Sequence, residues 1–234
     1  MFKKVLFLFL FLLGSLCAAN YDGVWFLGFN LDKEIFQGEN GRNNRIYLSQ
    51  VIDRQVICKK IFPDEKLAES TIYPLEEYAP INALADVLTK PITPEAKLIG
   101  SQLILMHTDG IKTCQAAQLI AAELASKNIN VILRKIDTSK YDNWEKALLK
   151  KDYDLFLMGF KSEYKKDIDT YLLPLFSSSG YANFMGYHNP VVDRQLTELA
   201  KTSANGKTTV YKLLDKSIAA DLPILPIFYI EEMH

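Results

Sequence analysis

The chain has 234 residues, with 27 basic and 28 acidic side chains, and 49% of it is hydrophobic. This length suits one large domain or two small ones, and the balance of apolar and charged residues excludes an intrinsically disordered chain. A net charge of −1 argues against nucleic acid as a partner, because a nucleic-acid binder needs a basic surface to displace the counterions of phosphates.

The N-terminus has the composition of a secretory signal peptide. Lys3 and Lys4 precede an uncharged apolar run over residues 5–13, and small residues follow, ending at Ala18 and Ala19. A charged start, an apolar middle and a small-residue exit are typical of a signal peptide. We therefore predict a signal peptide at residues 1–19 and a mature protein of residues 20–234 in the periplasm or outside the cell.

Two alternatives to simple cleavage remain open. An uncleaved membrane anchor is disfavoured, because the apolar run is shorter than the roughly 20 residues that span a bilayer. A lipoprotein attachment site at Cys17 is the minor alternative, because the bulky Leu16 precedes it where a small residue is expected.

The cysteines and histidines predict no metal site. After cleavage Cys58 and Cys114 remain, and no CxxC motif or histidine at ligand spacing accompanies them. An oxidising compartment permits a disulfide between them, but two buried free thiols are the simpler interpretation. We expect no metal and no other cofactor.

The first hundred residues give few regular patterns. The aromatic and β-branched run at 24–30 predicts a buried strand, and the turn-rich stretch 37–44 predicts a loop. Apolar pairs four residues apart predict one helix over 45–62. The proline-rich stretch 64–97 predicts a long excursion with a short helix near 83–88.

The rest of the chain alternates strands and helices. Strands are predicted at 102–106, 130–136 and 154–160, with a loop at 107–110 and helices at 113–127 and 141–151. This order indicates parallel strands joined by right-handed crossovers. Further on, a loop at 177–180 is followed by helices beginning at Asn189-Pro190 and spanning 207–221, with a break at Asn205-Gly206 and a final strand at 224–230. One α/β domain is the simplest account.

No catalytic motif is present, so we do not expect an enzyme. The sequence lacks GxSxG, HExxH, GxxxxGK[ST] and GxGxxG. Acidic residues including Glu163 and Asp169 follow the strand at 154–160, interspersed with lysines, and a solvated charged face is their common role. Their position still matters, because ligands of open parallel sheets bind outside the carboxyl ends of the strands.

The order of several sequence phrases resembles that of a known family. VWFLGFN at 24–30 and VIDR at 51–54 resemble the LGFN and AIDR stretches of the family 5 extracellular solute-binding proteins, the peptide- and nickel-type binding subunits of bacterial ABC importers. The strand at 154–160 followed by Glu163-Tyr164 resembles their GW-x-x-DY turn. NFMGYHNP at 183–190 and DLPILPIFY at 221–229 are similar to NFSGYSNP and DAPIIPLYY.

This resemblance implies the type II periplasmic binding protein fold, in which two α/β lobes close over a solute. Family members are longer, and the match covers essentially their second lobe. We therefore expect residues 20–234 to form a single lobe, with a largely parallel sheet flanked by helices, and the first lobe to be absent.

The implied function is that of an extracytoplasmic binding component that delivers short peptides or a similar small solute to an ABC transporter permease. The alternative is an orphan or remnant lobe that acts only as the interaction partner of a separately encoded first lobe, without independent solute binding.

The resemblance also implies ligand-binding residues: Phe160, Glu163, Tyr164 and Asp169. Glu163 takes the place of the family's acidic residue that receives a peptide's amino terminus, and Phe160 stands where Trp is common. A carboxylate beside an aromatic ring suits a cationic amine, through charge-assisted hydrogen bonds and cation–π attraction. The turn departs from the family in an apparent one-residue insertion within 165–169 and in lacking the usual prolines.

Overall fold

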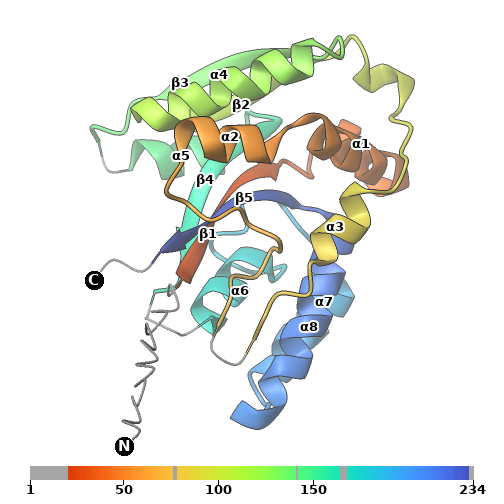
Figure 1. Cartoon of the computed structure of the whole chain (residues 1–234), viewed down its shortest axis with the longest axis vertical. Helices are drawn as coiled ribbons and strands as arrows, with labels where there is room; N and C mark the ends of the chain where they lie inside the picture. The colour runs from red at the N-terminus through yellow and green to blue at the C-terminus, as the bar shows by residue number, and fades with distance from the viewer. Residues whose placement is uncertain (1–20, 76–77, 141, 164–167, 232–234) are drawn as a thin grey trace, which may run out of the picture.

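A computed structural model describes residues 21–75, 78–140, 142–163 and 168–231, and its centre is a five-stranded sheet (Figure 1). The strands lie in the order β3-β2-β4-β1-β5. They are β1 (Tyr21–Phe29), β2 (Gln102–Thr108), β3 (Asn130–Ile136), β4 (Leu155–Lys161) and β5 (Ile224–Glu231). The predicted signal peptide at 1–19, with Cys17, and the predicted site residue Tyr164 lie outside the described residues.

Four of the five strands run in the same direction. β2 pairs in parallel with both β3 and β4, whereas β1 pairs antiparallel with both β4 and β5. The expected α/β architecture with a largely parallel sheet is therefore confirmed. The strand predicted at 24–30 is β1, and its antiparallel direction was not predicted. Its direction depends on pairing with strands more than 120 residues away, such as Leu27 with Leu157, and no local pattern records that.

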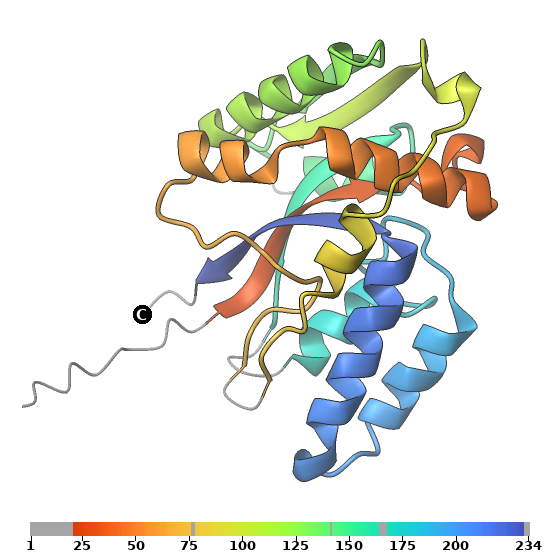
Figure 2. The ribbon, with the colours of Figure 1, turned by 45° about the vertical axis from the view of Figure 1, so that its right-hand side comes forward.

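Helices cover both faces of the sheet (Figure 2). One face, called here the α4 face, packs against α1 (Gly38–Val51), α2 (Arg54–Ile61) and α4 (Ile111–Ala125). The other, the α8 face, packs against α5 (Asn143–Leu149), α6 (Asp169–Phe176), α7 (Pro190–Leu199) and α8 (Ala204–Asp221). The short α3 (Ala83–Leu88) packs against α1 and α8.

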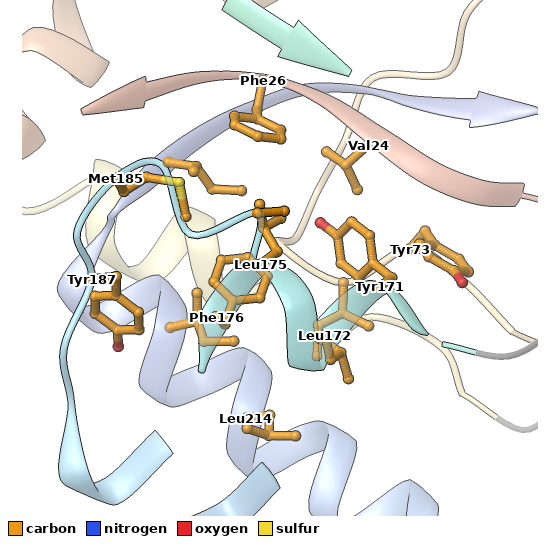
Figure 3. Close-up of a cluster of buried hydrophobic side chains, with 14 of the residues drawn as sticks. Val24, Phe26, Tyr73, Tyr171, Leu172, Leu175, Phe176, Met185, Tyr187 and Leu214 are labelled. Atoms are coloured by element: carbon orange, nitrogen blue, oxygen red, sulfur yellow. The ribbon is translucent and has the colours of Figure 1, made fainter. Parts of the chain in front are cut away.

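The core of the α8 face is rich in aromatic side chains (Figure 3). Tyr171 and Phe176 of α6 lie beneath Val24 and Phe26 of β1, and all four are buried. Gly28 is required here by close packing, because a Cβ atom at this position would come within 2.3 Å of the Phe156 ring. This contact accounts for the glycine in the strand at 24–30.

Two predictions for the region before residue 62 were wrong. Residues 38–44, predicted as part of a loop, form the start of α1, whose first residue Gly38 has a positive φ of 62°. The single helix predicted over 45–62 is two helices that meet at Ile52 and Asp53. The Asp53 carboxylate accepts a hydrogen bond from the Val56 N–H at 3.0 Å and so caps the start of α2, which is why a new helix begins there.

Later predictions also needed correction. Asn205 and Gly206 do not break a helix but lie in the first turn of α8. His107 and Thr108 belong to β2 and not to a loop. The helix α6 was not predicted, because it contains Pro174 and its apolar residues follow one another without helical spacing.

The cysteines are free thiols: Cys58 is buried and Cys114 is half-buried. Within the described ranges, no helix is long and apolar enough to cross a membrane.

Candidate functional site

The predicted site residues follow the carboxyl end of β4. Because β2, β3, β4 and β5 run the same way, their carboxyl ends lie at the same end of the sheet, and the antiparallel β1 begins there. Open α/β sheets bind ligands at the carboxyl ends of their strands. Phe160 and Glu163 therefore lie where the fold favours a binding site.

Phe160 forms a half-exposed aromatic surface near the end of β4. Its ring packs on the buried ring of Tyr171 from α6, with centroids 6.1 Å apart and a tilt of 43°. Tyr171 also donates a hydrogen bond to the carbonyl oxygen of Thr71 at 2.8 Å. This support limits the movement of the Phe160 ring while part of it stays open to solvent.

The turn after β4 is fixed to the start of β1. The Ser162 N–H donates to the carbonyl oxygen of Asp22 at 2.7 Å, and the Ser162 hydroxyl contacts that oxygen and the hydroxyl of Tyr73. Lys161 Nζ forms an ion pair with the mostly buried carboxylate of Asp22 at 2.8 Å. These contacts were missed in the sequence, because Asp22 and Ser162 are 140 positions apart and neither belongs to a motif.

Glu163 is exposed and its backbone is held in place. Its N–H donates to Thr170 Oγ1 at 3.0 Å, which links the turn to the start of α6. No hydrogen bond or ion pair of the Glu163 carboxylate is found in the part of the chain that the structure describes.

Asp169 has a different environment from Glu163. It is the first residue of α6, and its Oδ2 pairs with Lys207 Nζ of α8 at 2.8 Å, with only 22% of its side chain exposed. The structure thus places Asp169 next to the turn but commits its carboxylate to an ion pair between two helices.

Further charged side chains lie near the same end of the sheet. Burial raises the pKa of Tyr21, and two negative charges raise it further: Glu231 at the end of β5 and Glu65 in the loop after α2. Burial, and then the charge of Glu231, raise the pKa of Glu65. Lysines accompany these carboxylates: Lys66 Nζ lies 5.7 Å from the centre of the Tyr21 ring, and the charge of Lys112 opposes the rise in the pKa of Glu65.

A cleft of about 480 Å³ lies at the opposite end of the sheet, near the end of β1, and its buried arginine has a structural role. It lies beside Arg45, which is buried and donates to the carbonyl oxygens of Asp221, Leu222 and Phe36. Burial lowers the pKa of Arg45 to about 10, and the nearby Asp221 opposes that effect. The guanidinium thus satisfies the last carbonyls of α8, which a helix end leaves without partners.

No family model matches the chain, and no curated protein matches it. Several solved structures do match the chain. NikA from Staphylococcus aureus, in complex with Ni(L-His)2, superposes with a TM-score of 0.73 at 19% identity, over 90% of this chain and 46% of that chain. The murein tripeptide binding protein MppA from Escherichia coli superposes with a TM-score of 0.72 at 18% identity, over 91% of this chain and 43% of that chain. OppA from Burkholderia pseudomallei superposes with a TM-score of 0.73 at 16% identity, over 91% of this chain and 44% of that chain.

The fold is that of one part of a solute-binding protein. The chain spans less than half the length of these structures. The resemblance drawn from the sequence phrases is thereby confirmed at the level of the fold.

Proposed function

We propose that the chain is an extracytoplasmic solute-binding component of a peptide-type ABC importer, that it binds short peptides or a similar small solute, and that it delivers them to a permease. The observation that carries this proposal is the exposed Glu163, three residues after the half-buried Phe160, at the carboxyl end of β4 in a fold similar to that of solute-binding proteins. Two similar structures named for peptides support the choice of solute, the murein tripeptide binding protein and an OppA in complex with RPPGFSPFR.

In this proposal Glu163 receives the amino terminus of the peptide. The Phe160 ring lies under the ammonium group or the first side chain, where cation–π attraction adds to the ion pair. Tyr164 is included in the proposal from its place in the sequence, directly after Glu163. Asp169 contributes mainly by holding the start of α6 through Lys207. No bond is made or broken, so the protein binds without catalysing a reaction.

The proposed location outside the cytoplasm has its own test. Cleavage after Ala19 leaves Asn20 as the first residue, so N-terminal sequencing of protein recovered from the periplasm or medium should begin near Asn20. An intact Met1 on protein from the cytoplasm would contradict the proposal, and lipid on Cys17 would place the protein at the membrane surface.

The binding site is tested by calorimetric titration of a pool of di- to pentapeptides. The residues named in this proposal form one wall of a site, so we expect dissociation constants on the order of millimolar, a few kcal/mol in all. Glu163→Gln should abolish this binding, and so should N-acetylation of the peptides, because each removes one charge of the ion pair. The matched control is Glu198→Gln on the exposed surface of α7. Binding unchanged by both modifications would move the site away from this turn.

A further inference from the structure

The outer edge of β3 is open, unlike the other edge of the sheet. The Asn130 N–H donates to the carbonyl oxygen of Ser101 at 2.9 Å, toward β2. Successive residues of a strand alternate in direction, so the N–H and C=O groups of Val131, Leu133 and Lys135 point away from β2. In the described part of the chain no strand pairs with them.

The opposite edge strand, β5, is covered by the chain itself. The Ala68 N–H donates to the carbonyl oxygen of Ile227 at 3.0 Å, and the Tyr229 N–H donates to that of Lys66 at 2.9 Å. An open edge is a template for pairing with another chain. The protein therefore protects one edge of its sheet and leaves the other available.

A groove of about 370 Å³ runs beside the open edge, between β3 and α5. Its apolar lining residues are Met106, Ile136 and Ala147, while Arg134 of β3, Lys146 of α5 and Lys150, which caps the end of α5, supply cationic groups. A strand edge beside a helix gives a peptide both backbone partners and side-chain contacts.

The charge of the groove is mainly positive. Its carboxylates are engaged, since Asp152 pairs with Arg134 at 2.7 Å and Asp137 Oδ1 accepts from the Ser139 N–H at 2.8 Å. Lys146 pairs with Asp142. No ion pair of Lys135 or Lys150 is found within the described ranges. Four cationic side chains, Arg134, Lys135, Lys146 and Lys150, lie against the three carboxylates of Asp137, Asp142 and Asp152, so the groove keeps a net charge of about +1 along β3 and the end of α5.

We propose that this groove docks an extended acidic segment of a partner protein, which adds as a sixth strand beside β3. The backbone of the segment would pair with Leu133 and Lys135, and carboxylates at alternate positions would face Lys146 of α5 and Lys150 at its C-terminal end. A second copy of this chain is a poorer occupant, because pairing β3 with itself brings Arg134 and Lys135 against like charges. The groove lies two strands away from β4, so the proposal does not depend on the peptide site at Glu163.

The backbone pairing is tested with Lys135→Pro. The N–H that this substitution removes points outward, and proline is tolerated on an edge strand, so the protein should keep its fold. A fluorescein-labelled ten-residue peptide of alternating Glu and Thr is titrated by fluorescence anisotropy. We expect Lys135→Pro to weaken binding about tenfold or more, and Lys135→Ala, which keeps the N–H, to weaken it about threefold or less.

The charge pattern is tested with Lys150→Glu and with a matched peptide that has Lys in place of Glu. We expect Lys150→Glu to weaken binding of the acidic peptide and the Lys peptide not to bind. Thermal melting of each variant checks the fold. Three results would overturn the proposal: equal binding of both peptides, Lys135→Pro binding as well as Lys135→Ala, or displacement of the peptide by inorganic phosphate at equal concentration. Association of the chain with itself through β3 in sedimentation would identify a second copy as the occupant and would overturn it as well.

Discussion

The two faces of the sheet are stabilised in different ways. On the α4 face, helices with regular apolar spacing bury side chains such as Leu48, Ile57 and Ile120. On the α8 face, an irregular segment over 66–75 and Tyr78 pack with the helices, and a buried carboxylate lies among them. The α4 face thus depends mainly on apolar packing, with local hydrogen bonds from Asn44 and Arg54, and the α8 face also depends on a cluster built around a buried carboxylate.

The centre of that cluster is Asp215 of α8. Its carboxylate accepts hydrogen bonds from the hydroxyl groups of Ser70, Thr71 at 3.1 Å and Tyr78 at 2.6 Å. The Tyr229 hydroxyl accepts from the Ser70 N–H at 3.1 Å. An irregular segment can be buried only when its polar groups have partners, and Asp215 provides several of them.

The largest effect is expected for Asp215→Ala. It leaves three buried hydroxyl groups without their common acceptor, so we expect the free energy of unfolding to fall by about 4 kcal/mol. Asp215→Asn keeps the shape and one acceptor oxygen, so its loss should be about half as large. Urea denaturation measures both. Equal losses for the two variants would show that the shape of the side chain, and not its acceptor oxygens, holds the segment.

The next largest effect is expected on the α4 face. Ile120→Ala creates a cavity at a fully buried position, and we expect a loss of about 3 kcal/mol. Because Ile120 and Asp215 lie on opposite faces of the sheet, the double variant with Asp215→Asn should show additive losses within about 0.5 kcal/mol. Strong coupling in the double-mutant cycle would mean that the two faces do not act separately.

Arg45→Lys tests a contact between the helices of the two faces. Arg45 lies on α1 and donates to carbonyl oxygens at the end of α8, and a lysine cannot reproduce its planar set of donors. We expect a loss of about 2 kcal/mol in urea denaturation. Hydrogen exchange should increase at the end of α8 and not in α4. The control is Arg194→Lys on the exposed side of α7, which should be neutral.

The same contrast explains how much of the fold could be predicted. The regular segments were found well: β3 at 130–136 and α3 at 83–88 have the bounds that the sequence pattern predicted. The start of α1, the break before α2 and the helix α6 were missed. There a glycine, a capping aspartate and a proline determine local structure without changing the apolar spacing.

The candidate site likewise has a part that the sequence predicts and a part that it does not. The position of Glu163 beyond a strand's carboxyl end could be predicted, because a parallel α/β order fixes where strands end. The contacts of Ser162 and Lys161 with Asp22, and of Asp169 with Lys207, could not, since they join residues that only the folded sheet and helices bring together.

The smallest expected effect is on the pH dependence of stability. It tests whether burial or hydrogen bonding has the stronger influence on the pKa of Asp215. Burial raises the pKa of Asp215 above its ordinary value of 3.8, and the hydrogen bonds from Ser70, Tyr78 and Thr71 oppose the rise. When the pKa is higher in the folded state, the folded protein binds the proton first on acidification. Stability then increases as the pH falls through the folded pKa, and the gain is complete below about 3.8.

The variant Asp215→Asn isolates this contribution, because asparagine does not titrate and all other carboxyl groups are shared. We expect the stability difference between the natural protein and Asp215→Asn to shift in favour of the natural protein as the pH is lowered from 7 toward 4. Chemical denaturation at several pH values measures it. A shift in the opposite direction would mean that the three hydroxyl donors outweigh burial, and that the α8 face holds a carboxylate whose ionised form the fold stabilises.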